Sequence, residues 1–193
     1  MCNPSAAILC PGPSLADVDA TWTAYRHVFA VNGACRSPLP WTHWICADAR
    51  SVERHIPDEM RNRELLIPWS EILKRGWNWE AFRDRGGVTN GYYLVDVCRP
   101  IKWLSSRSVV KYTFLHAIAI LVSYGASVID IYGADLDGDG YYGAESRYAT
   151  EGGNRWGDQK KLLKRITERA AENGVTIRRV PSLPKVVVQT ISK

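Results

Sequence analysis

A Gly-Pro-Ser-Leu turn at residues 12–15 is the first part of the sequence whose residue types suit ligand binding. It follows Ala6–Cys10, an apolar run that predicts a fully buried strand. Ligands gather at the carboxyl ends of strands in open parallel sheets, and the N–H groups of a following helix can bind phosphate. We therefore expect a phosphate-binding turn made of Gly12, Pro13, Ser14 and Leu15. An ordinary strand-to-helix turn with Ser14 as the helix N-cap explains the same residues.

Two further polar positions follow apolar runs that predict strands. Asn32 and Gly33 come directly after His27–Val31, and Asp48 comes after Trp44–Ala47. The carboxyl ends of parallel strands meet at one edge of a sheet, so we expect these residues on the same rim as the first turn. There Asn32 can bind a nucleoside, and Asp48 can bind a hydroxyl group or act as a base. A turn-forming or capping role explains each residue equally well when it is taken alone.

An aspartate-rich segment follows the strand predicted at Val128–Tyr132. Its residues Asp135, Asp137 and Asp139 match the opening of a calcium-binding EF-hand loop. The glutamate that such a loop needs at its twelfth position is replaced by Ser146, and a strand precedes the segment where a helix is required. We therefore expect no calcium site, and a divalent ion carried in by a diphosphate is the alternative for these three aspartates.

The same segment contains side chains that suit a phosphate-binding flap. Tyr141, Tyr142 and Arg147 can donate hydrogen bonds to phosphate from a mobile loop. Asp135, at the end of its strand, is a candidate ligand or general base. A solvated acidic loop with no binding role is the alternative. Among the histidines, His43 and His116 are conceivable acid–base groups.

The bulk composition is that of a globular protein. The chain has 193 residues, of which 46% are hydrophobic, and no apolar run approaches the roughly 20 residues that a membrane span needs. No signal peptide is visible, so a cytoplasmic location without membrane association is expected. The five cysteines are odd in number and lack CxxC spacing, which argues against a disulfide framework and a zinc site.

Short apolar runs alternate with helical patterns along the chain, which is typical of βαβ units. We therefore predict a single α/β domain over residues 1–193, with a Rossmann-like, mostly parallel sheet flanked by helices. One helix is expected from Ser106 or Ser108 to about Ser123, and residues 92–97 are expected to form a strand or sheet edge. Residues 50–105 are interpreted as an irregular insertion on the acceptor side of the site.

Positive charge is concentrated near the end of the chain. The formal net charge is +5, and an amphipathic helix predicted at residues 156–173 carries many of the basic residues. Such a face suits a polyanion, and a solvated helix face is the plainer explanation. The chain also has eight tryptophans, some of which could stack on a base or a sugar. We place Trp156, Lys160 and Lys161 on the acceptor side.

Together these motifs resemble a known group. The segment Ala-Ile-Leu-Cys-Pro-Gly-Pro-Ser-Leu at residues 7–15 is similar to the first strand and loop of the bacterial sialyltransferases of glycosyltransferase family 42. It is equally similar to hydroxymethylpterin diphosphokinase-like proteins. Asn32, Asp48 and the segment Ile129–Asp135 match later elements of both groups. Small phage-type relatives add a Tyr-Tyr-Gly segment, a tryptophan-containing helix and an Asn-Gly-Val turn, matched here by residues 141–143, Trp156 and residues 173–175.

The resemblance implies a glycosyltransferase that moves a sugar from a nucleotide-sugar donor to an acceptor hydroxyl in a single displacement. Sialyltransferases of this family use a histidine in the late loop as general base. Residues 136–155 of this chain contain no histidine, so Asp135, Asp48 and Glu145 are the candidates for the general base. Hydroxymethylated bases of phage DNA are one candidate acceptor, and saccharides are another. A magnesium-dependent diphosphate-transfer enzyme and a non-enzymatic nucleotide or nucleic-acid binding module are the alternative functions.

Overall fold

Seven parallel strands form one sheet at the centre of the molecule. The computed structural model describes residues 5–18, 25–57, 63–75, 87–136 and 153–180. The strands are β1 Ser5–Leu9, β2 His27–Val31, β3 His43–Ile45, β4 Glu64–Pro68, β5 Val88–Tyr92, β6 Val128–Tyr132 and β7 Thr176–Arg179. Their order across the sheet is β5-β4-β3-β2-β1-β6-β7, and every neighbouring pair is parallel. The predicted single α/β domain with a parallel sheet is therefore confirmed.

The strand order reverses at β1. From β1 the chain builds the sheet outward to β5 on one side, and it then returns to place β6 against the other side of β1. Leu9, the last residue of β1, is paired with both Ala30 of β2 and Tyr132 of β6. The turns that follow β1 and β6 are therefore neighbours, and such a switch point is where open α/β sheets bind ligands.

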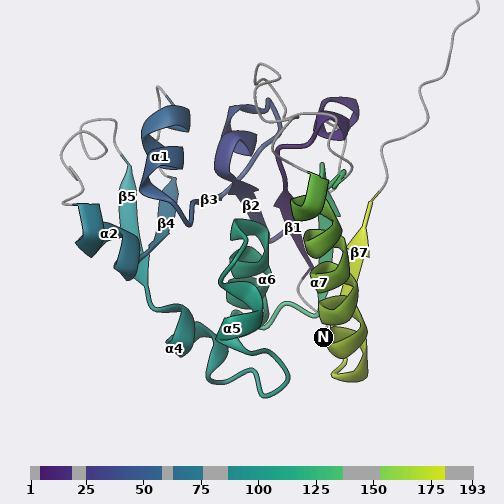
Figure 1. Cartoon of the computed structure of the whole chain (residues 1–193). Helices are drawn as coiled ribbons and strands as arrows, with labels where there is room; N and C mark the ends of the chain where they lie inside the picture. The colour runs from purple at the N-terminus through teal and green to yellow at the C-terminus, as the bar shows by residue number, and fades with distance from the viewer. Residues whose placement is uncertain (1–4, 19–24, 58–62, 76–86, 137–152, 181–193) are drawn as a thin grey trace, which may run out of the picture.

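Helices cover both faces of the sheet, since parallel strands are apolar on both sides. The helical segments among the described residues are η1 Pro13–Asp17, η2 Asn32–Arg36, α1 Ala49–His55, α2 Trp69–Arg75, α4 Leu94–Cys98, α5 Ser106–Val109, α6 Thr113–Ser123 and α7 Gly153–Glu172. Residues of α4 to α7 pack on one face, and residues of η1, η2, α1 and α2 pack on the other. In Figure 1, α6 and α7 stand side by side against the strands.

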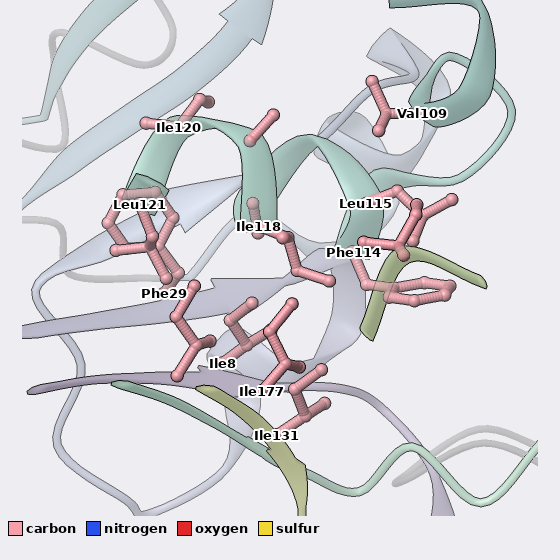
Figure 2. Packing of buried hydrophobic residues seen from close by; sticks show 14 of the residues in the cluster. Ile8, Phe29, Val109, Phe114, Leu115, Ile118, Ile120, Leu121, Ile131 and Ile177 are labelled. Carbon is pink, nitrogen blue, oxygen red and sulfur yellow. The ribbon is translucent and has the colours of Figure 1, made fainter. Parts of the chain in front are cut away.

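The side chains of β1 point alternately to the two faces of the sheet, so this strand contributes to the hydrophobic core on each face. Ile8 lies in the cluster with α6, whereas Leu9 lies in the cluster on the opposite face. Figure 2 shows Ile8, Phe29 and Ile118 within the first cluster, and all three side chains are fully buried. Burying each such side chain contributes roughly 1.5–3 kcal/mol, so α6 is held firmly against the central strands.

The helix expected from Ser106 or Ser108 to Ser123 is divided into two. α5 begins after Ser105, and α6 begins after Tyr112, whose extended backbone accepts the first hydrogen bonds of α6. The break is held by His116, whose Nε2–H donates to the carbonyl of Val110 at 3.3 Å. The apolar spacing of four that predicted one helix starts at Val110, but Val110 lies in the break and is exposed, whereas Val109 of α5 packs on the same core as α6.

Residues 92–97 also differ from expectation. β5 ends at Tyr92, and α4 begins at Leu94, so most of this stretch is helical. The strand lies earlier and includes Asn90-Gly91, which the sequence presents as a turn. Asn90 and Gly91 pair with Leu66 and Ile67 of β4, and the indole of Trp69 packs where a side chain at position 91 would lie, which requires a glycine there.

Residues 50–105 contribute β4 and β5 to the same sheet, together with most of α1 and all of α2 and α4. The described part of this stretch therefore extends the sheet regularly. Its place on the acceptor side stays a prediction. Within the described ranges, no helix is long and apolar enough to cross a membrane.

Candidate functional site

Two glycines bring the turns after β1 and β6 into direct contact. The backbone N–H of Gly12 donates to the carbonyl of Gly133 at 2.8 Å. A side chain at Gly12 would overlap this carbonyl and the carboxylate of Asp135, and one at Gly133 would overlap the carbonyl of Cys10. Gly133 also has a φ of +66°, a conformation that favours glycine. The residue types at both positions are therefore set by this close approach.

Ser14 and Asp135 join the two turns through their polar groups. The backbone N–H of Ser14 donates to Oδ2 of Asp135 at 2.8 Å, and its hydroxyl donates to Oδ1. Ser14 is not the N-cap of η1: Gly12 occupies that position, without a side-chain hydrogen bond. The N-cap alternative for Ser14 is therefore wrong, because its hydroxyl bonds to Asp135 in the turn after β6.

The amides of the first turn are already occupied. Pro11 and Pro13 have no N–H, and the N–H of Leu15 donates to the carbonyl of Gly12 at 3.1 Å. The N–H groups of Gly12 and Ser14 donate to the turn after β6, as described above. No amide of residues 11–15 is therefore free in this structure. Phosphate binding by the turn stays a prediction, and for Ser14 it requires the Asp135 carboxylate to move aside.

Asn32 lies at the end of the neighbouring strand with an unsatisfied polar atom. It has a φ of +48°, a region in which asparagine is enriched, and its carbonyl accepts from Nε1 of Trp44 at 2.8 Å. Its side-chain oxygen Oδ1 is buried and has no hydrogen-bond partner among the described residues. A buried acceptor of this kind is normally paired, so Asn32 is well suited to accept a hydrogen bond from a ligand.

Asp48 caps a helix, which was the alternative to a role as ligand or base. Its Oδ1 accepts from the backbone N–H of Arg50 at 3.0 Å, which caps α1. The side chain is exposed, and no partner of its second carboxylate oxygen occurs within the described part of the chain. Capping and a role as base are compatible because one oxygen is left over.

His55 was not predicted as a site residue. Its imidazole packs against Gly33, 3.3 Å from where a side-chain carbon at that position would lie, and its Nδ1 is buried without a partner among the described residues. Burial lowers the pKa of His55, and the charges of Arg36 and Arg54 lower it further. His55 is therefore a neutral group close to Asn32. No spacing pattern in the sequence marks it.

The two histidines proposed as acid–base groups lie elsewhere. His116 is buried, and its Nδ1 accepts from the hydroxyl of Tyr92 at 2.7 Å while its other nitrogen is also engaged. His43 begins β3, so it lies at the amino end of the strands, where its Nε2 is 3.2 Å from Oε2 of Glu64. Neither has a free nitrogen at the switch point.

Several predicted residues lie outside the described residues. They are Asp137, Asp139, Tyr141, Tyr142, Glu145 and Arg147. Trp156 belongs to α7, but its side chain is likewise outside the description, whereas Lys160 and Lys161 are exposed on the same helix. Among the described residues, no group of three or more metal-ligating side chains is present.

The fold is shared with solved sialyltransferase structures. The sialyltransferase CstII from Campylobacter jejuni in complex with cytidine-5′-monophosphate aligns over 92% of this chain and 80% of its own, with a TM-score of 0.56 and 10% identity. The sialyltransferase CST-II with a trisaccharide acceptor and CMP aligns over 92% and 81%, with a TM-score of 0.52 and 11% identity. No family model and no curated protein matches the chain.

At this level of identity the likeness establishes the fold. It agrees with the architecture implied by the resemblance to family 42 sialyltransferases. The resemblances to pterin diphosphokinases and to small phage proteins remain predictions.

Proposed function

We propose that the chain is a glycosyltransferase that moves a sugar from a nucleotide-sugar donor to an acceptor hydroxyl. In a single displacement, the acceptor oxygen forms a bond to the anomeric carbon as the bond from that carbon to the donor phosphate breaks. The phosphate leaves with the bonding electron pair, and a base takes the hydroxyl proton. The observation that carries this proposal is the junction of Gly12, Ser14 and Asp135 at the switch point of the sheet.

The nucleoside would be bound through Asn32. Its buried Oδ1 lacks a partner among the described residues and can accept a hydrogen bond from a ribose hydroxyl or a base amino group. The neighbouring Gly33 is buried, with the neutral imidazole of His55 packed against it. CMP, the nucleotide in the related structures, is a ligand of this class.

The phosphate would lie at the turn of residues 12–15, with Tyr141, Tyr142 and Arg147 as further donors. Because Asp135 holds both polar groups of Ser14 in this structure, phosphate binding by Ser14 must displace that carboxylate. A carboxylate and a phosphate oxygen are interchangeable as acceptors for the same N–H and O–H groups.

The general base would be Asp135 or Asp48. Asp135 lies directly at the switch point, but both of its oxygens accept hydrogen bonds from Ser14. Asp48 lies two strands away, is exposed and keeps one oxygen without a partner among the described residues. Displacement of Asp135 by phosphate would free it at the moment when a base is needed, which favours Asp135 during turnover.

Thermal shift with a panel of nucleotides and nucleotide sugars tests donor binding. A donor at 100 times its dissociation constant should add about 2.7 kcal/mol to the free energy of unfolding. With the donor identified, Asp135→Asn and Asp48→Asn are compared by single-turnover transfer. Loss of the base should slow transfer roughly 10²- to 10⁴-fold, whereas loss of the other carboxylate should have a much smaller effect. A panel in which no nucleotide or nucleotide sugar raises the melting temperature would refute the proposal.

The acceptor would approach α7, where Trp156, Lys160 and Lys161 lie. The exposed lysines favour an anionic acceptor such as DNA with hydroxymethylated bases, and a saccharide is the other candidate. Titration of duplex affinity against salt separates them, because each phosphate contact adds about −0.9 to the slope of log affinity against log salt. A flat slope would remove DNA as the acceptor.

A further inference from the structure

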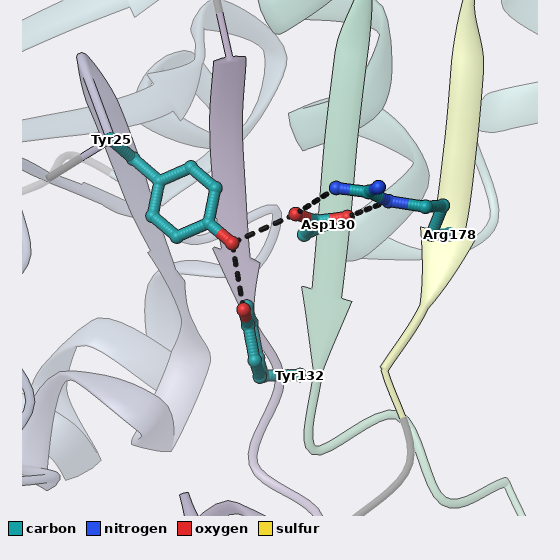
Figure 3. Close-up of polar contacts among 4 residues, drawn as sticks. All are labelled: Tyr25, Asp130, Tyr132 and Arg178. Atoms are coloured by element: carbon teal, nitrogen blue, oxygen red, sulfur yellow. Dashed lines mark hydrogen bonds and ion pairs between the residues drawn. The ribbon is translucent and has the colours of Figure 1, made fainter. Parts of the chain in front are cut away.

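Two adjacent arginines of β7 have opposite environments. Successive side chains of a strand point to opposite faces of the sheet, so Arg178 and Arg179 lie on different sides. Arg178 donates through Nε to Oδ1 of Asp130 at 2.6 Å and through Nη2 to Oδ2 at 2.7 Å. Figure 3 shows Arg178 reaching from β7 to Asp130, which the hydroxyl of Tyr25 approaches from the other side. The charge of Arg178 is therefore neutralised within the fold.

Arg179 lies at the carboxyl end of β7, and its charge is not neutralised in this way. Its Nη2 donates to the backbone carbonyl of Asp135 at 3.1 Å, and its side chain is exposed. Within the described ranges it forms no ion pair. The carboxylate of Asp135, whose carbonyl Arg179 contacts, is turned to Ser14. Among the residues that the structure describes, the positive charge of Arg179 is therefore unpaired, and it lies next to Asp135, which joins the turns at the switch point.

We propose that Arg179 binds the phosphate of the nucleotide donor. The inference rests on the proposed function and names a residue for it outside the motifs of the sequence. An arginine presents its N–H donors in a planar fork that matches phosphate, and the single bond to the Asp135 carbonyl leaves most of them available. The carbonyl fixes the position of the guanidinium at the rim, and the negative charge that grows on the leaving phosphate would strengthen the contact during transfer.

The test measures what the phosphate group adds to affinity. Each of the four ribonucleoside 5′-monophosphates and its parent nucleoside are titrated calorimetrically into the full chain, and the tightest pair is retained. The ratio of the two dissociation constants is then compared among the unmodified chain, Arg179→Gln, Arg179→Lys and Arg165→Gln. Arg165 is an exposed arginine of α7, so its variant controls for the loss of one positive charge.

We expect Arg179→Gln to weaken monophosphate binding roughly 10- to 100-fold and to leave nucleoside binding unchanged. Arg179→Lys should recover part of the loss, because the charge returns without the fork. Arg165→Gln should change neither constant by more than about twofold, as expected of a screened surface charge.

The outcomes separate the two proposals. Equal monophosphate affinity in the unmodified chain and in Arg179→Gln would overturn the role of Arg179 while leaving donor binding intact. Equal losses for monophosphate and nucleoside would also overturn it, since they would show a structural effect. A chain that binds neither ligand of any pair would refute the proposed function, and the role of Arg179 with it.

Discussion

The carboxylate of Asp135 accepts hydrogen bonds from both the backbone N–H and the hydroxyl of Ser14, a residue 121 positions earlier in the chain. The contact ties the turn after β1 to the turn after β6 at the point where the sheet reverses its order. It also places a negative group where a ligand phosphate is expected. Stability and binding at this site are therefore coupled through one pair of residues.

A double-mutant cycle measures this pair. Hydrogen bonds to a charged acceptor contribute about 1.5–3 kcal/mol, and partial exposure of both residues reduces that figure. We expect Asp135→Asn and Ser14→Ala each to lower the free energy of unfolding by about 1–2 kcal/mol. Denaturant unfolding of both single variants and the double variant should give an interaction energy of about 1 kcal/mol. Strict additivity of the two changes would contradict the coupling.

Gly12 should tolerate no side chain. A methyl group there would overlap the carbonyl of Gly133 and the carboxylate of Asp135, both of which are held by hydrogen bonds. Overpacking of this kind costs about 1–3 kcal/mol, so Gly12→Ala should lower the melting temperature by several degrees. The matched control is Gly157→Ala in α7, where nothing lies within 4 Å of the added carbon. The control should leave stability unchanged or raise it by about 0.5–1 kcal/mol. Similar changes in stability for Gly12→Ala and Gly157→Ala would show that the contact between the turns after β1 and β6 leaves room for a side chain at position 12.

Folding stability should fall as the pH drops below neutrality. Burial lowers the pKa of all four histidines, His27, His43, His55 and His116, from the usual 6.5. The unfolded chain then binds protons at a higher pH than the folded chain, so the histidine contribution is complete above pH 6.5 and is lost as the pH falls below it. Chemical denaturation at intervals from pH 7.5 to 5 should give a steadily decreasing free energy of unfolding.

Glu64 is the exception to this trend. Burial raises its pKa above the usual 4.5, so its contribution is present at low pH and is lost as the pH rises through its folded pKa. This opposes the histidine effect only near the acid end of the range. The variant His116→Gln provides the control, because its pH slope should be shallower than that of the unmodified chain. A free energy of unfolding that does not change between pH 7.5 and 5 would contradict the conclusion that burial lowers the pKa of the histidines.

The hydroxyl of Tyr25 should contribute to stability. It donates to Oδ2 of Asp130 at 2.8 Å and lies 2.7 Å from the hydroxyl of Tyr132 (Figure 3). Tyr25→Phe should lower the free energy of unfolding by about 1 kcal/mol, measured by denaturant melts. The control is Tyr124→Phe, since Tyr124 is 51% exposed and its hydroxyl has no hydrogen bond to the described residues. Equal effects would mean that the Asp130 network adds nothing beyond the generic loss of a hydroxyl.

Removal of metal ions distinguishes the transferase from a diphosphate-transfer enzyme. The proposed site uses protein donors for phosphate, so nucleotide affinity and transfer should be the same in excess chelator and in excess Mg²⁺. A magnesium-dependent enzyme using Asp135, Asp137 and Asp139 would instead lose its activity in chelator and regain it when Mg²⁺ is added back. That result would replace the proposed reaction with diphosphate transfer.

Local patterns in the sequence were enough to predict most strands of the sheet. The apolar run at Val128–Tyr132 coincides with β6, and the run at Ala6–Cys10 is offset from β1 by one residue, because a buried parallel strand is recognisable from its own residues. β5 was misplaced, because Asn90-Gly91 is a local turn signal that pairing with Leu66 and Ile67 of β4 overrides. The break between α5 and α6 was missed for a related reason, since His116 and Val110 are joined only in the folded chain.

By itself the sequence determined that this is a parallel α/β protein with polar residues at the ends of its strands. It could not determine which of those residues meet, because pairing depends on strand order rather than on local periodicity. The placement of β6 beside β1 decided that Asp135 bonds to Ser14, and the placement of β7 beside β6 decided that Asp130 neutralises Arg178 but not Arg179. Charges and hydrogen bonds act over a few ångströms, so their partners are set by the tertiary fold alone.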